Sequence, residues 1–257
     1  MALIRINQKF QAVPHGSVGP YGSALRSDEA PGERMIRVAE MFGIGLDEAY
    51  EVTLYDGFGV DVRPGDVVLV TGPSGSGKSV LVRRLEAALR QWPGRVVNLA
   101  AVDLPADRPV IEMMQSPLDK SLRILSLAGL ADAFLLLRSA EELSDGQRYR
   151  LRLARAIETL LHGGEENAER GARRDGEAKP WRVLVADEFC STLDRLCARA
   201  VAYRVRRLAD AWGLTVLAAA AHDDLLDDLA PDVLIVKHEG ARVEVRYADP
   251  TRCEAAS

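Results

Sequence analysis

Residues 66–79 combine an apolar run with a cluster of glycines, a lysine and a serine. The run Val67–Val70 is typical of a buried strand, and leucines recur at helical spacing after Ser79. In such a Gly-rich loop, backbone N–H groups surround phosphate oxygens and the helix N-terminus adds partial positive charge. The amine of Lys78 can reach β- and γ-phosphates, and the hydroxyl of Ser79 can ligate Mg²⁺.

A Gly/Ser-rich turn can match this pattern by chance, but the flanking strand and helix are the context that the phosphate-binding loop requires. The sequence therefore predicts binding of a nucleoside triphosphate with Mg²⁺. The predicted phosphate-binding residues are Gly72, Ser74, Gly75, Ser76, Gly77, Lys78 and Ser79.

Two adjacent carboxylates, Asp187 and Glu188, follow the apolar stretch Val183–Ala186. Two acids after a strand are often a helix N-terminal charge pair. Downstream of a phosphate loop, however, they lie at the carboxyl end of a strand, where ligands bind. Asp187 can then hold Mg²⁺ through water, and Glu188 can polarise the attacking water.

A third polar motif, Leu143-Ser-Asp-Gly-Gln147, precedes a long helical pattern. Ser144 and Gln147 have the spacing of a capping box. Gly146 costs about 1 kcal/mol of helix stability against alanine, which suggests that a ligand approaches the backbone there.

Together with Gln115, Ser-Thr-Leu-Asp194 and His222, these ordered motifs resemble those of the ABC-type ATPases, within the P-loop NTPase superfamily. The resemblance covers about residues 50–240. It implies a head-to-tail dimer in which each ATP lies between the phosphate loop of one subunit and the signature motif of the other.

By this resemblance, Ser144 and the N–H of Gly146 would contact the γ-phosphate across the interface, and Gln147 would belong to the same nucleotide-binding motif. The same resemblance assigns roles to three further residues. Gln115 corresponds to the glutamine that senses Mg²⁺ and the attacking water, Asp194 to an aspartate near the interface, and His222 to the switch histidine on the γ-phosphate.

Family members also stack adenine on an aromatic residue upstream of the phosphate loop. The candidates are Tyr50, Tyr55 and Phe42, with Tyr50 the first choice and core packing the alternative for each.

Three features depart from the family pattern. Asp145 stands where the signature usually has glycine, and Phe189-Cys190 follows Glu188 where transporter subunits usually continue with proline. Ser144 follows Gln115 by only 29 positions, so the helical region that grips membrane domains in transporter subunits is shortened.

The elements that must position these residues alternate between strand and helix after residue 50, which predicts an α/β fold with a mostly parallel sheet flanked by helices. We expect short strands at Tyr50–Tyr55 and Phe58–Val62 to form a small antiparallel subdomain, and a strand within residues 1–13. A helix is expected over Met35–Phe42, with Gly43 as its stop.

The domain prediction divides the chain into an extension, 1–49, and an ATPase domain, 50–257, with a short helical subdomain at 116–150. The helix after Ser144 should end near Leu161. Residues 162–180 hold four glycines and nine charged residues, a composition that predicts a mobile surface loop.

Composition is that of an ordinary globular protein, with 47% apolar and 28% charged residues and a net charge of −5. Three cysteines without metal spacing, and no apolar run long enough for a bilayer, predict a cytoplasmic protein with reduced thiols. Arg5 and Lys9 interrupt the apolar start of the chain, so we expect no signal peptide.

The departures favour an ATP-driven, homodimeric switch that acts on a soluble protein or nucleic acid, with a membrane reached only through a partner subunit. The alternative is the nucleotide-binding subunit of an ABC membrane transporter. Chromosome-type ATPases would need a heptad run, which the sequence lacks, and a kinase or GTPase would not explain Ser144–Gln147 together with His222.

Overall fold

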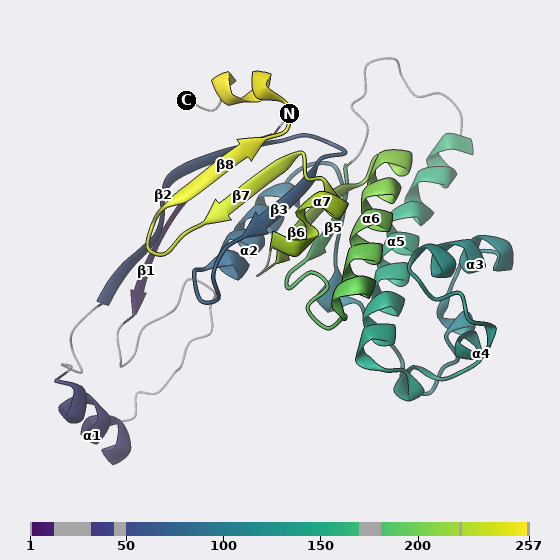
Figure 1. Cartoon of the computed structure of the whole chain (residues 1–257), viewed down its shortest axis with the longest axis horizontal. Coiled ribbons are helices and arrows are strands. Elements are labelled where there is room, and N and C mark those ends of the chain that lie inside the picture. Colours follow the sequence, from purple (N-terminus) through teal and green to yellow (C-terminus); the bar gives the residue numbers. More distant parts are fainter. Residues whose placement is uncertain (1, 13–31, 44–49, 170–180, 221–222, 256–257) are drawn as a thin grey trace.

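The computed structural model describes residues 2–12, 32–43, 50–169, 181–220 and 223–255. At its centre is a six-stranded sheet with the order β4-β5-β6-β3-β7-β8 (Figure 1). All neighbouring pairs are parallel except β7 and β8. A separate antiparallel pair joins β1 to β2. The strands are β1 Ala2–Ala12, β2 Tyr50–Val62, β3 Val67–Thr71, β4 Gly94–Asn98, β5 Trp181–Ala186, β6 Thr215–Ala220, β7 Val233–Lys237 and β8 Val243–Tyr247.

Helices cover both faces of the sheet, and short helical turns connect them. The α-helices are α1 Glu33–Phe42, α2 Lys78–Leu89, α3 Leu118–Leu127, α4 Ala133–Leu136, α5 Asp145–Glu169, α6 Arg195–Trp212 and α7 Leu226–Leu229. The 3-10 turns are η1 Leu99–Ala101, η2 Ile111–Met113, η3 Ala140–Glu142, η4 Asp223–Leu225 and η5 Pro250–Ala255. The predicted mostly parallel sheet with flanking helices is confirmed.

The central strand β3 shows why two layers form. Successive side chains of a strand point to opposite faces. Val67 and Leu69 pack into the cluster that contains the apolar sides of α5 and α6, whereas Val68 and Val70 pack with α2 and β2. All four side chains are buried. Figure 1 shows α5 and α6 side by side on one face of the sheet.

The predicted strand in residues 1–13 is present as β1, but the predicted pair Tyr50–Tyr55 and Phe58–Val62 is wrong. These two stretches form one strand, β2, which pairs along its length with β1. Gly57, at a φ of 59°, lies where the register with β1 shifts. The expected turn is therefore an irregularity within a strand, as an extra residue in a β-bulge produces.

The helix that begins at Asp145 is longer than predicted. It continues through Gly163 and Gly164 to Glu169, so the first part of the expected loop 162–180 is helical. Residues 170–180 lie outside the described part of the chain. The predicted stop of α1 is confirmed, because Gly43 caps it in the left-handed conformation, and Gly213 caps α6 in the same way.

Three neighbouring strands, β5, β6 and β3, end at the same edge of the sheet. The phosphate-loop sequence follows β3, the two carboxylates follow β5, and β6 ends at Ala220. This edge is where ligands bind in parallel sheets. Within the described ranges, every helix is too short or too polar to cross a bilayer.

Candidate functional site

The loop between β3 and α2 is shaped by glycines at backbone angles that other residues avoid. Gly72, Gly75 and Gly77 have φ values of 143°, 76° and 100°. A Cβ at Gly72 would lie 2.0 Å from the carbonyl oxygen of Lys237, so only glycine fits there. The close approach at Gly72 therefore brings the loop backbone against the end of β7.

Lys78 begins α2 and its side chain folds back over the loop. Its Nζ donates hydrogen bonds to the carbonyl oxygens of Gly72, at 2.7 Å, and Pro73, at 2.8 Å. The ammonium group is therefore held at the centre of the loop, where the β- and γ-phosphates of a nucleotide would lie.

Tyr55 supports the loop from behind. Its hydroxyl donates to the carbonyl oxygen of Gly77 at 2.7 Å, and the Nζ of Lys237 lies 5.3 Å from the ring centre. The ring is fully buried, so Tyr55 cannot stack on adenine, and this candidate is wrong. Phe42 is 73% exposed on α1, and the side chain of Tyr50 lies outside the described part of the structure.

One cavity of about 670 Å³ brings the two acidic residues to the phosphate loop. Lys78 and Ser79 line it together with Asp187 and Glu188. Its other lining residues are Ser74, Gly75, Gly77, Val80, Phe189, Cys190, Ser191, Leu193, Arg195, Ala198, Ala219, Ala220, Asp224 and Leu225. The cavity thus joins a cation, a hydroxyl and two carboxylates, the groups that phosphoryl transfer needs.

The donor set fits Mg²⁺ only together with a triphosphate. Among the described residues no group of three or more His, Cys, Asp or Glu could hold a metal ion. Mg²⁺ commonly takes one or two protein ligands and completes its shell with phosphate oxygens and water. Ser79 and Asp187 on this cavity match that pattern, and the hydroxyl of Ser76 is buried in the same loop without a hydrogen-bond partner.

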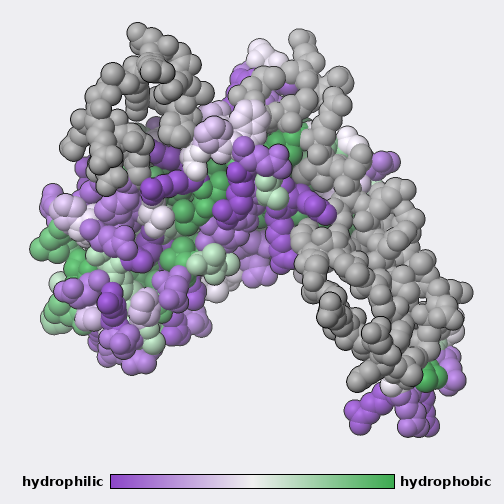
Figure 2. Space-filling view, turned by 180° about the vertical axis from the view of Figure 1, so that it is seen from behind, coloured by the Kyte–Doolittle hydropathy of each residue, from purple (hydrophilic) through white to green (hydrophobic). Residues whose placement is uncertain are grey.

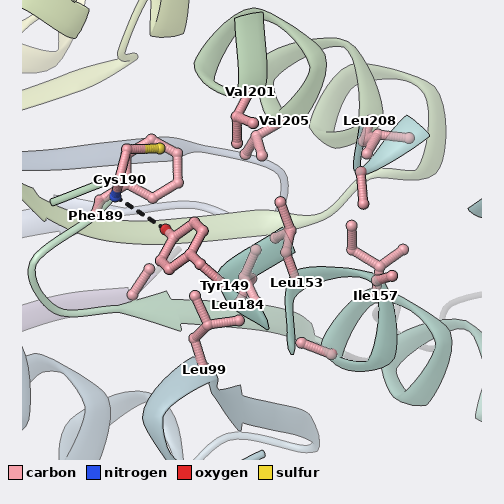
Figure 3. Packing of buried hydrophobic residues seen from close by; sticks show 14 of the residues in the cluster. Leu99, Tyr149, Leu153, Ile157, Leu184, Phe189, Cys190, Val201, Val205 and Leu208 are labelled. Carbon is pink, nitrogen blue, oxygen red and sulfur yellow. Dashed lines mark hydrogen bonds between the residues drawn. The ribbon is translucent and has the colours of Figure 1, made fainter. Parts of the chain in front are cut away.

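Glu188 lies at a strained position of the backbone. Both Glu188 and Cys190 adopt left-handed conformations, with φ values of 55° and 60°. For residues other than glycine this costs about 1–3 kcal/mol each and persists only where surrounding contacts enforce it. Two hydrogen bonds supply such contacts. The N–H of Phe189 donates to the carbonyl of Ala219 at 2.6 Å, and that of Cys190 to the hydroxyl of Tyr149 at 3.0 Å (Figure 3).

Burial also shifts the pKa values of Cys190 and Tyr149. It raises the pKa of the Cys190 thiol to about 12 and raises that of the Tyr149 hydroxyl well above its ordinary value. Both groups therefore stay protonated near neutral pH. Phe189, which follows Glu188 in place of the proline expected from transporter subunits, is buried in the same cluster (Figure 3).

The signature residues do not line this cavity within one chain. Ser144 and Gln147 instead form the expected capping box, with bonds of 2.9 Å from the Ser144 N–H to Oε1 and 3.3 Å from the Gln147 N–H to Oγ. The capping interpretation is confirmed. The exposed Asp145 pairs with Arg148 at 3.0 Å, which offsets its charge.

Gly146 has a structural neighbour that the sequence could not reveal. A Cβ there would lie 3.1 Å from Cδ2 of Leu193. The helix start and the segment after Glu188 are therefore in close contact inside one chain. The further idea that a ligand approaches Gly146 stays a prediction.

The other three predicted residues have different positions. Gln115 is exposed and does not line the cavity, and its N–H donates to Oε1 of the buried Glu158 at 2.9 Å. Asp194 caps α6 by accepting from the Cys197 N–H at 2.9 Å, and its bonding to Cys197 lowers the pKa of the Asp194 carboxyl. His222 lies outside the described residues.

Sequence reasoning missed three residues that organise the site: Tyr149 and Glu158 on α5, and Arg195 on the cavity wall. Glu158 accepts N–H bonds from both Gln115 and Ser116, and Arg195 forms an ion pair with Asp224 at 3.1 Å. A buried carboxylate in an apolar helix face is a signal that could have drawn attention to Glu158.

Comparison with known proteins agrees with this geometry. The family model described as the AAA ATPase domain matches residues 53–230. Among curated relatives, the methionine import ATP-binding protein MetN of Streptomyces coelicolor is 28% identical over 238 residues, covering 75% of this chain and 61% of its own. The hemin import ATP-binding protein HmuV of Agrobacterium fabrum is 29% identical over 216 residues. The match covers 73% of this chain and 77% of HmuV.

Solved structures show the same fold. The dimeric structure of a bacterial ABC transporter cassette has a TM-score of 0.52 at 15% identity, covering 76% of this chain and 91% of that one. The ADP conformation of an ATP-binding cassette of an ABC transporter has a TM-score of 0.53 at 22% identity. The match covers 79% of this chain and 92% of that cassette. Since the family model spans more than half of the chain, the chain belongs to the AAA ATPase domain family of P-loop ATPases, and it is an ATP-binding ATPase of the ABC type.

Proposed function

We propose that this chain is a nucleotide-binding subunit that closes head to tail with a second copy on two Mg-ATP and thereby drives an ABC membrane transporter. One observation carries the enzymatic part: Lys78, Ser79, Asp187 and Glu188 line a single cavity at the carboxyl edge of the sheet. These groups come from two separate stretches of chain, and their combination matches what ATP hydrolysis requires.

Each group has a distinct task at this cavity. Lys78 binds the β- and γ-phosphates, and Ser79 and Asp187 would hold Mg²⁺, which would neutralise charge on the phosphate oxygens. Glu188 accepts a hydrogen bond from water and orients it for in-line attack on the γ-phosphorus. The water oxygen bonds to the γ-phosphorus as the bond to the β–γ bridging oxygen breaks, Glu188 takes up the water proton, and ADP and inorganic phosphate leave.

The proposed pairing with a second copy follows from what the cavity lacks. In one chain Ser144, Gly146 and Gln147 lie outside the cavity lining. The exposed Ser144 directly precedes the long helix α5, whose N-terminal partial positive charge attracts phosphate. A second copy can bring this helix start to the open side of the cavity, as the dimeric cassette with the same fold supports.

The proposed membrane partner replaces the soluble partner that the sequence departures favoured. MetN and HmuV are both named as import ATP-binding proteins, and this favours the transporter alternative. The chain covers 61% of the length of MetN, so its partner is inferred by analogy.

A surface feature of the region between Gln115 and Ser144 supports a protein partner. Four large apolar side chains there are exposed: Leu118 at 63%, Leu122 at 40%, Phe134 at 78% and Leu137 at 72%. Figure 2 shows apolar patches on the lobe that carries α3 and α4. Exposed apolar groups that gather on one lobe are typical of a surface that another protein covers.

A soluble, ATP-driven switch remains the second candidate. The observation that favours it is the small size of this lobe, whose α-helices α3 and α4 span 10 and 4 residues. A lobe of this size offers little surface for gripping a membrane subunit.

Capture of the partner tests the proposal. Glu188→Gln, which should bind ATP without hydrolysing it, is expressed with a tag in its native cells and purified in mild detergent with Mg-ATP. We expect integral membrane proteins with several spans to co-purify. Lys78→Ala, which should not bind ATP, is the matched control. A soluble protein or nucleic acid retained by Glu188→Gln, without membrane components, would contradict the transporter assignment.

A further inference from the structure

The hydroxyl of Tyr149 holds the backbone that follows Glu188, although it lies on a different element, 41 residues earlier in the chain. Tyr149 is on α5, two residues after the signature motif, and its side chain is 8% exposed. Its oxygen accepts the hydrogen bond of the Cys190 N–H at 3.0 Å, and Figure 3 shows the ring reaching from α5 toward that nitrogen.

A second contact joins the same two segments. Gly146, one helical turn before Tyr149, lies against the side chain of Leu193, where a Cβ would come within 3.1 Å. Residues three apart lie on one face of a helix. The first turns of α5 therefore contact the segment 188–194 at two points.

The segment that receives these contacts has little freedom of its own. Turn bonds join the Ser191 N–H to the Glu188 carbonyl at 3.0 Å and the Leu193 N–H to the Cys190 carbonyl at 3.1 Å. Since Glu188 and Cys190 are both left-handed, loss of an outside contact would release the turn toward ordinary backbone angles. The carboxylate of Glu188 would then leave its place on the cavity wall.

We propose that Tyr149 is a positioning residue for Glu188: its hydrogen bond to the Cys190 N–H makes the placement of the catalytic carboxylate depend on the placement of α5. This inference rests on the proposed role of Glu188 in ATP hydrolysis. It has a consequence for the dimer, because the residues at the start of α5 are the ones proposed to contact the γ-phosphate of the ATP bound to the second copy. Contact of that helix start with the second copy would therefore change the position of the Glu188 carboxylate in the same chain.

Steady-state hydrolysis by the full chain tests this inference. Tyr149→Phe keeps the ring and removes only the acceptor oxygen. Because small displacements of a catalytic group reduce turnover strongly, kcat should fall about 10- to 100-fold. ATP affinity, measured calorimetrically in the Glu188→Gln background, should change less than about twofold, because Tyr149 does not line the cavity.

The matched control is Tyr203→Phe, which removes a hydroxyl from a tyrosine that is 53% exposed on α6. It should leave kcat unchanged. All variants are assayed at least about 15 °C below their unfolding midpoints, since loss of the buried bond also lowers stability. Should Tyr149→Phe not fold, Leu193→Ala probes the same connection from the other contact, with the same expected loss of kcat at saturating ATP, since Leu193 also lines the cavity.

Non-additivity separates positioning from a purely structural role. In the Glu188→Gln background, Tyr149→Phe should cause no further loss of hydrolysis, because the group that it positions is already gone. The inference alone would be overturned if Tyr149→Phe kept the parent kcat. It would also be overturned if Tyr149→Phe lowered kcat by the same factor in the parent and in the Glu188→Gln background. Parent turnover that does not depend on Glu188 would overturn the proposed function, and the inference with it.

Discussion

The ammonium group of Lys78 already has two partners in the phosphate loop, the carbonyl oxygens of Gly72 and Pro73. A bound triphosphate would offer it charged acceptors in place of neutral ones, which adds the attraction between opposite charges to the hydrogen bonds. At the scale of single residues, the site is thus shaped before the nucleotide arrives, and its key groups are held by backbone contacts.

Replacement of this lysine should therefore abolish binding. We expect Lys78→Ala to weaken ATP affinity by about 100-fold or more, the loss of two charged hydrogen bonds of about 1.5–3 kcal/mol each. Isothermal titration with ATP measures this change. Lys120→Ala, a lysine on α3 that does not line the cavity, is the control and should bind as the parent does.

Glu188→Gln should separate binding from hydrolysis. The amide cannot accept the proton of the attacking water, so phosphate release should slow by about 100- to 10,000-fold while ATP affinity is kept. A coupled phosphate assay beside the titration checks both expectations. Hydrolysis at the parent rate would show that another group is the base.

Tyr55 allows a test of loop support without touching the cavity. Tyr55→Phe removes the 2.7 Å bond to the Gly77 carbonyl, worth about 0.5–1.5 kcal/mol, and so should weaken ATP affinity by about 2- to 10-fold. Titration with ATP measures it. An unchanged affinity together with a lowered unfolding midpoint would mean that the hydroxyl serves folding alone.

At the scale of elements, the C-terminal turn η5 fastens the sheet edge through one buried arginine. Arg252 is 4% exposed, and its Nη1 and Nη2 donate to the carboxylate of Asp66 at 3.2 and 2.7 Å. Nη2 also donates to the Asp61 carbonyl at 2.8 Å, and the guanidinium carbon lies 5.0 Å from the Tyr247 ring centre. One side chain thus connects η5 to the end of β2, the start of β3 and β8.

Removing that side chain should destabilise the fold strongly. Arg252→Ala leaves Asp66 as a buried charge without its partner, which typically costs about 3–5 kcal/mol of unfolding free energy. Urea unfolding of the full chain measures the loss. The matched control is Arg246→Ala, whose pair with Glu244 is exposed and should be worth at most about 1 kcal/mol. Equal effects of the two substitutions would contradict the anchoring role of Arg252.

The elements also show what the sequence could and could not predict. The phosphate loop and the Asp187-Glu188 pair were predictable because each lies in one contiguous stretch whose residue types and neighbouring strand are all local. The single strand β2 was not, since Gly57 signals a turn unless the distant strand β1 pairs across it. The extension of α5 past Gly163 and Gly164 likewise runs against glycine's helix propensity.

The supporting residues of the site escaped prediction for a related reason. Each of these residues forms a hydrogen bond with a partner far away in the chain. The separations are 22 residues for Tyr55, 41 for Tyr149 and 43 for Glu158. Their roles depend on how strands and helices pack together, and no local pattern encodes that. Tyr55 is one of three candidates for stacking on adenine because an aromatic residue upstream of the loop has a suitable sequence position. Its burial, which depends on the sheet, confirms the alternative of core packing.

At the scale of the whole molecule, the cavity of one chain lacks the residues at the start of α5. Lys78 and Glu188 line the cavity, and Ser144 does not. If two copies close head to tail, each site combines Lys78 of one chain with Ser144 of the other. A site of this kind can be rebuilt from two chains that are each inactive.

The most direct test of this account is a complementation measurement of ATP hydrolysis. Lys78→Ala and Ser144→Arg are purified separately, shown to be folded and nearly inactive, and then mixed in equal amounts. Head-to-tail closure predicts that mixed dimers hold one intact site, so phosphate release should recover to a substantial fraction of the parent rate. If the mixture stays as inactive as its components while the parent hydrolyses ATP, the site is not shared between two copies, and the central claim is wrong.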